Sequence, residues 1–182
     1  MSAFPTPVIH SARLDLRTFG PGDAGLVRAH LAAGAEPEAL PPGAPSDPDD
    51  VAGWLADGVH WPQREGVGVH LMMLDRAADK IVGSISLFHA DWDVRSAEIG
   101  YGVRSDERGK GYASEALGAV ARWALKDGGL QRAWLTAATD NVASVRVAEK
   151  AGFRREGTLR RTGLEDDGLH DQALFSLLDD EL

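Results

Sequence analysis

The order of apolar and polar positions divides the chain into segments with strand-like and helix-like periods. Within residues 11–19, Leu14 and Leu16 alternate with charged residues, which is the pattern of a half-buried strand. From Tyr112, apolar residues recur at helical spacing as far as the glycines at 128 and 129, which suit the end of a helix. The same criteria predict strands near 66–74, 80–89, 97–104, 132–138, 153–160 and 171–178, and helices near 24–33, 49–58 and 141–151.

This order of elements predicts a mixed α/β fold. The chain has 182 residues, 43% of them hydrophobic, which is enough for the core of one ordinary domain. Residues 34–48 hold five of the nine prolines and are expected to form a loop. Because no internal repeat or linker divides the chain, we expect a single domain over residues 1–182.

Composition and charge exclude or disfavour several classes of protein. The absence of cysteine excludes disulfides and thiolate chemistry, and the six scattered histidines predict no metal site. A formal net charge of −9 disfavours nucleic-acid binding. It would suit a cationic amine substrate, but an acidic surface also serves solubility alone. No apolar run is long enough to span a membrane, and the first residues lack the features of a secretory signal. We therefore expect a cytoplasmic protein without a membrane partner.

A glycine-bearing loop, Arg108-Gly109-Lys110-Gly111-Tyr112-Ala113, precedes the helix that begins near Tyr112. Glycine lets the backbone approach an anion closely, and a helix N-terminus offers free N–H groups and a positive dipole end. The loop therefore favours diphosphate binding. The pattern is weak alone, because structural turns use it too, and it matches neither a Walker loop nor a dinucleotide fingerprint, in which Ser114 would be glycine.

A second cluster lies in residues 141–153. Ser144, Val147 and Ala148 share one face of the predicted helix. Local structure explains each residue of the cluster as well, since Asn141 can cap the helix and Gly152 can end it.

Taken together, these clusters resemble the GNAT superfamily of N-acetyltransferases, and within it the RimJ/RimL type that acetylates protein N-termini. The resemblance is carried by RLDLR at 13–17, AEIGYGV at 97–103, RGKGYASEAL at 108–117, NVASVRVAEKAGF at 141–153 and EGTLR at 156–160. It implies a curved mixed sheet of six to seven strands with about four helices, splayed open between the strands at 97–104 and 132–138. Acetyl-CoA would lie in that opening.

The resemblance also implies roles for matching residues. The backbone of Tyr101, Gly102 and Val103 would pair with the pantetheine arm, and Asn141 would hydrogen-bond it. The pyrophosphate would be held by the amides of Arg108, Gly109, Lys110, Gly111, Tyr112, Ala113 and Ser114. Ser144 would protonate the departing thiolate, unless its hydroxyl makes only a local hydrogen bond.

Two departures from the family pattern bear on these roles. Asp106 stands at the first position of the loop, where glutamine or arginine is usual, and this matters little if backbone amides bind the phosphates. Many relatives have a tyrosine acid late in the chain, where this sequence has Phe175. The acid would then be Ser144, or no dedicated acid would exist.

Glu98 is the candidate general base. It lies on the predicted cleft strand and points opposite to Ile99, Tyr101 and Val103. A half-buried carboxylate there would suit proton transfer from an amine near neutrality. Alternatively, Glu98 is solvated or pairs with an arginine such as Arg95. A backbone N–H near Val103 would stabilise the oxyanion.

The resemblance implies a primary amine as the acceptor and favours the α-amine of a protein N-terminus. The alternatives are a small-molecule amine as acceptor and a bulkier acyl group, such as succinyl, as the group transferred. A non-enzymatic sensor of acyl-CoA is the alternative of another class, and the protein could be a monomer or a homodimer. Trp54, Trp61 and Trp92 fall near the acceptor side by analogy, where they pack in the core or shape the pocket, with residues 34–50 as a lid.

Overall fold

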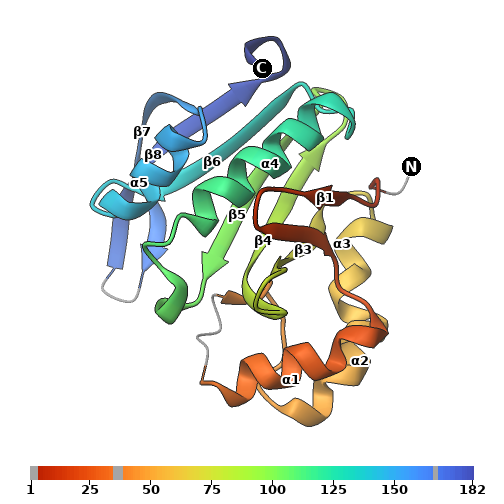
Figure 1. Ribbon diagram of the computed structural model, residues 1–182. Coiled ribbons are helices and arrows are strands. Elements are labelled where there is room, and N and C mark those ends of the chain that lie inside the picture. Colours follow the sequence, from red (N-terminus) through yellow and green to blue (C-terminus); the bar gives the residue numbers. More distant parts are fainter. Residues whose placement is uncertain (1–3, 35–38, 166–167) are drawn as a thin grey trace.

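A computed structural model describes residues 4–34, 39–165 and 168–182. Over these residues the strands of the protein form one mixed sheet, with eight strands in the order β1-β2-β3-β4-β5-β6-β8-β7 (Figure 1). The strands are β1 (Val8–His10), β2 (Leu14–Thr18), β3 (Val69–Asp75), β4 (Lys80–Asp91), β5 (Ser96–Val103), β6 (Arg132–Ala138), β7 (Arg154–Glu165) and β8 (Gly168–Leu178). All neighbours are antiparallel except β5 and β6, which are parallel.

Five α-helices accompany the sheet in the described part of the chain. They are α1 (Ala24–Ala32), α2 (Val51–Ala56), α3 (Trp61–Arg64), α4 (Tyr112–Lys126) and α5 (Val142–Lys150). The expected mixed sheet flanked by helices is therefore confirmed, with one strand and one helix more than expected. The strand β1 and the helix α3 were not predicted, because three residues are too few to show alternation and four too few to show a helical period.

The core lies on both faces of the sheet. On one face, α4 buries Ala116, Leu117, Val120 and Ala121 against strand residues such as Ile99. On the other face, α1 and α2 enclose a second cluster that contains Trp54, Phe19 and Met72. Every residue of β3 is buried, as expected for a strand covered on both sides.

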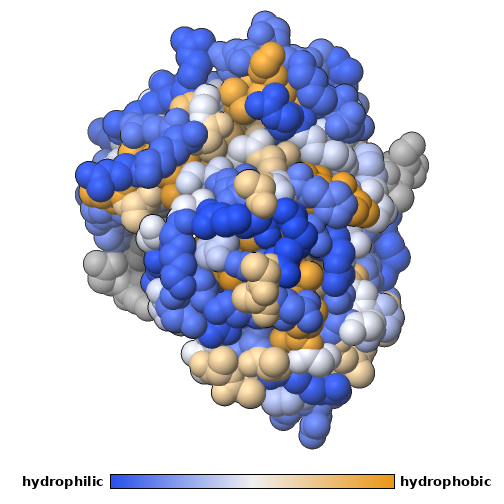
Figure 2. Space-filling model, viewed as in Figure 1, coloured by the Kyte–Doolittle hydropathy of each residue, from blue (hydrophilic) through white to orange (hydrophobic). Residues whose placement is uncertain are grey.

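The surface in the view of Figure 1 is mostly hydrophilic, with hydrophobic residues in small separate groups (Figure 2). Among the described residues, no helix has both the length and the apolar character needed to cross a membrane. Scattered apolar side chains of this kind are normal on a folded domain.

Candidate active site

The sheet opens between β5 and β6. The two strands pair only at Ser96–Arg132, Ala97–Ala133 and Glu98–Trp134, and then separate. The opening lies between the two strands where the family resemblance implied it. Beyond Glu98, β5 keeps β4 on one side, so its other edge faces the opening.

The edge of β5 presents backbone groups to this opening. The N–H of Arg104 donates to the carbonyl of Val82 on β4 at 3.0 Å. Because successive amides of a strand point to opposite edges, the N–H groups of Val103 and Tyr101 point away from β4. Such an edge can pair with an extended ligand as an added strand would. The Nε–H of Arg108 donates to the carbonyl of Val103 at 3.1 Å, which ties the next loop to this edge.

The loop that follows β5 has the backbone of an anion site. Gly109 and Gly111 have φ values of +78° and +86°, a conformation that L side chains adopt only with strain. The first hydrogen bond of α4 runs from the N–H of Glu115 to the carbonyl of Gly111 at 3.1 Å. The N–H groups of Tyr112, Ala113 and Ser114 precede that bond and lie at the positive end of the helix dipole. These amides can bind a phosphate.

Arg13 on the β1–β2 connection holds this loop in place. Its Nη1 donates to the carbonyl of Lys110 at 2.9 Å, and its Nε donates to Glu115 at 2.8 Å. The guanidinium also lies 4.3 Å from the ring centre of Tyr112. Although burial opposes ionisation, hydrogen bonds from Ser11 and Arg13 lower the pKa of Glu115. A charged pair therefore fixes the start of α4.

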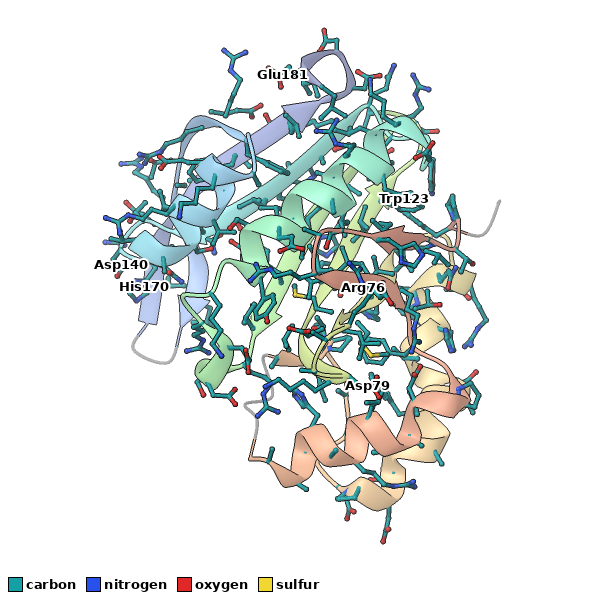
Figure 3. The ribbon with its side chains drawn as sticks, in the orientation of Figure 1. Arg76, Asp79, Trp123, Asp140, His170 and Glu181 are labelled. Carbon is teal, nitrogen blue, oxygen red and sulfur yellow. The ribbon has the colours of Figure 1, made fainter. Side chains whose placement is uncertain are left out.

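Arg76, labelled in Figure 3, fixes the connection that carries Arg13. Its guanidinium donates to the carbonyls of Ser11, Ala12 and Leu14 at 2.7–2.8 Å. Residues more than sixty positions apart thus combine to set the loop geometry.

Two side chains of the loop point away from a phosphate position. The hydroxyl of Tyr112 donates to Asp75 in the protein interior, and this bond raises the pKa of the phenol. The Nζ of Lys110 lies 2.8 Å from a carboxylate oxygen of the buried Glu107, which also contacts Lys80. The ammonium of Lys110 is therefore paired within the protein, and the main-chain amide remains the group of Lys110 that is predicted to bind the pyrophosphate. Asp106 pairs with Arg104 at 2.9 Å.

Ser144 and Tyr101 join across the opening. The Tyr101 hydroxyl lies 2.9 Å from the Oγ of Ser144, and burial raises the pKa of the phenol. Ser144 thus makes more than a local hydrogen bond. Asn141 accepts a hydrogen bond from the N–H of Ser144 at 3.0 Å, so the capping role weighed for Asn141 is present. Phe175 is fully buried in the core and presents no group to the opening.

Glu98 lies at the last position where β5 and β6 still pair. Its side chain is 22% exposed, so the expected half-burial is confirmed. Its Oε2 lies 2.9 Å from the Nδ1 of His89, which replaces the arginine partner considered from the sequence. It shares a sheet face with Gly100 and Phe88, opposite to Ile99.

A cavity of about 440 Å³ lies on this same face. Its lining consists of small, hydroxyl and apolar residues, namely Leu40, Pro42, Ser84, Ser86, Phe88, Gly100, Tyr101 and Gly102. Leu40 and Pro42 come from the segment expected to act as a lid, of which residues 35–38 lie outside the described part.

The three tryptophans do not line this cavity. Trp54 is buried against Phe19 in the second core cluster, with ring centres 5.1 Å apart. Trp92 packs on Phe4 at 5.2 Å and donates to the carbonyl of Gly66. Trp61 is 55% exposed. Trp54 and Trp92 therefore pack in the core or at its rim.

Over the described residues no cluster of three histidine or carboxylate side chains has the arrangement of a metal site. The sequence-based reading also missed three features: His89, the side chain of Tyr101 and the role of Arg13. The contacts of Arg13 and Tyr101 join elements far apart in the sequence, whereas that of His89 joins consecutive strands at a separation of nine positions. Arg13 lies in the motif at 13–17 and Tyr101 in the motif at 97–103, while His89 lies in no motif singled out from the sequence.

Comparison with known proteins agrees with this geometry. Residues 13–154 match the acetyltransferase (GNAT) domain family. The chain is 31% identical over 106 residues to the uncharacterized N-acetyltransferase YnaD of Bacillus subtilis strain 168, covering 58% of this chain and 62% of that protein. It is 28% identical over 144 residues to the ribosomal-protein-serine acetyltransferase of Escherichia coli K12, covering 70% and 80%.

A solved structure shares the whole architecture. Mycobacterium smegmatis RimJ, in complex with CoA-disulfide, superposes with a TM-score of 0.80 at 25% identity, covering all of this chain and 92% of the other. The opened sheet, the glycine loop and the family match lead to one conclusion: the chain belongs to the GNAT acetyltransferase family.

Proposed function

We propose that the protein transfers an acetyl group from acetyl-CoA to a primary amine, and that the amine is the α-amine of a protein N-terminus. The observation that carries the proposal is that one strand segment borders both halves of the site. Tyr101 and Gly102 line the cavity, while the N–H of Tyr101 points into the opening between β5 and β6. A donor in the opening and an amine in the cavity would meet there.

The donor fits the loop geometry. Amides from Arg108 to Ser114 would hold the pyrophosphate, and the edge of β5 would pair with the pantetheine arm. RimJ, the structural relative, contains a form of CoA. The relation to a ribosomal-protein-serine acetyltransferase supports a protein acceptor.

The cavity also favours an N-terminus over a polyamine or an aminoglycoside. Those small molecules carry several positive charges, which require carboxylates nearby. Among the residues that the structure describes, the cavity lining has two serines, one tyrosine, two glycines and three apolar residues, and no carboxylate. Glu98, next to Gly100 on the same face, can accept a single proton.

In this scheme, an uncharged amine attacks the thioester carbonyl, and its proton passes to Glu98. The N–H of Val103 would stabilise the oxyanion, and Ser144 would protonate the thiolate with Tyr101 beside it. Removing the base should reduce the rate by about 10²–10⁴-fold.

The test is a thiol-release assay over N-terminal peptides, polyamines and aminoglycosides. It compares the wild type with Glu98→Gln and with Glu65→Gln, a control on an exposed residue. Turnover selective for peptides and lost only in Glu98→Gln supports the proposal. Turnover of polyamines alone would assign a small-molecule acceptor. Binding of acetyl-CoA without any thiol release would indicate a sensor.

A further inference from the structure

The carboxylate of Glu98 has one structural partner that no motif predicts. The Nδ1 of His89 lies 2.9 Å from Oε2 of Glu98, and the histidine side chain is 77% exposed. A deprotonated carboxylate can only accept, so this contact requires a proton on Nδ1. His89 therefore donates to one oxygen of Glu98, and Oε1 keeps its capacity to accept a proton.

An irregularity in β4 brings the imidazole to this position. Phe88 pairs with Glu98 and Asp91 pairs with Ser96, so two residues of β4, His89 and Ala90, stand opposite one residue of β5. This is a β-bulge. In a regular strand, His89 would point to the face opposite to Phe88, away from Glu98. The bulge turns it toward Glu98, as bulges beside functional sites often do.

The backbone of His89 is strained. Its φ is +48°, in the left-handed region, where glycine is usual and asparagine, aspartate and histidine are the commonest of the other residues. Glycine would relieve this strain and would still allow the bulge. The histidine side chain is 77% exposed although the residue lies within β4, so burial does not account for a histidine at this position. Its one hydrogen bond from the side chain goes to Glu98.

We propose that His89 is a positioning residue for the general base: it fixes the carboxylate of Glu98 so that Oε1 faces the acceptor cavity. The inference rests on the role proposed above for Glu98. In this role the imidazole does not carry the proton that leaves the amine. Its Nδ1–H only donates a hydrogen bond to Glu98, and its Nε2 can stay in solvent. Without the hydrogen bond, the carboxylate would rotate about its side-chain torsions and meet the amine less often.

Three variants test the proposal. His89→Gly removes the hydrogen bond and relieves the backbone. His89→Asn tolerates the left-handed conformation and offers an amide N–H in place of Nδ1–H, but it cannot titrate. Arg95→Gly is the matched control, since Arg95 also has a positive φ, of +50°, lies just before β5, and forms no side-chain hydrogen bond or ion pair with Glu98 in the described part of the chain.

For each variant, thiol release with acetyl-CoA and a peptide gives kcat and both KM values, and thermal unfolding gives Tm. We expect His89→Gly to lower kcat by roughly 10- to 100-fold, with the KM for acetyl-CoA unchanged and Tm equal or higher. His89→Asn should recover most of kcat, and Arg95→Gly should retain it. A Tm that does not fall while kcat falls separates positioning from a structural role.

The contrary outcomes are distinct. If His89→Gly keeps the kcat of the wild type, His89 does not position the base. If His89→Asn is as slow as His89→Gly, the imidazole itself is needed and positioning is the wrong role. If the wild type releases no thiol with any amine, the proposed function fails and this inference fails with it; wild-type turnover that is insensitive to His89 overturns the inference alone.

Discussion

His70 is buried on β3, with its Nδ1 2.8 Å from the hydroxyl of Ser86 in the cavity wall. Burial lowers the pKa of its imidazole from 6.5 to about 4. The folded protein therefore holds this proton less tightly than the unfolded chain does. Between the two values the unfolded chain is protonated at this site and the folded protein is not, so the free energy of unfolding falls as the pH falls.

The pKa difference sets the size of this effect. Linkage gives a loss of about 1 kcal/mol between roughly pH 7.5 and pH 5.5, and about 3 kcal/mol once the pH is below both values. Measurements between roughly pH 7.5 and pH 5.5 are the most informative about His70. Carboxylates with lowered pKa, such as Asp75 and Glu107, lose their contribution only at more acidic pH.

Urea unfolding of the wild type and His70→Asn across this range measures the effect. Asparagine can keep a hydrogen bond to Ser86 without titrating. His30, whose pKa is also lowered by burial, is present in both proteins, so their difference isolates His70. We expect the free energy of unfolding to fall by about 1 kcal/mol more in the wild type than in the variant between roughly pH 7.5 and pH 5.5. Equal pH dependence in the two proteins would refute the reasoning.

Three further predictions follow from the loop and the opening. Gly111→Ala, just before α4, should lower the free energy of unfolding by about 1–2 kcal/mol because of the positive φ of Gly111, whereas Gly118→Ala inside α4 should raise it by up to about 1 kcal/mol, as urea unfolding would show. Arg13→Ala should weaken CoA binding roughly tenfold in calorimetry, because the charged hydrogen bonds that hold the loop are lost. Tyr101→Phe and Ser144→Ala should have non-additive effects on kcat, since each removes the same hydrogen bond, and a double-mutant cycle measures the coupling.

Local signals explain why much of the fold was predictable. The helix from Tyr112 has a strong apolar period, and its start is marked by glycines whose positive φ the structure confirms. Gly152, with a φ of +90°, ends α5 as expected. The opening beside β5 came from the family resemblance rather than from any local pattern.

Contacts between distant elements explain what the sequence did not reveal. The hydrogen bond from Arg13 to the carbonyl of Lys110 spans 97 positions, and that between Tyr101 and Ser144 spans 43. The turn of His89 toward Glu98 depends on a bulge that alternation cannot predict, because it breaks the alternation. The ion pair between Lys110 and the buried Glu107 likewise depends on the folded loop and is not marked by any motif.

The most direct test of the account is an amide chemical-shift titration of the ¹⁵N-labelled protein with CoA, and in parallel with pantetheine, which lacks the pyrophosphate. We expect CoA to shift the amides from Gly109 to Ser114 strongly, and pantetheine to leave them in place while shifting those of Tyr101 and Val103. Amides of Gly109 to Ser114 that stay unmoved at saturating CoA would contradict the claim that this loop binds the diphosphate.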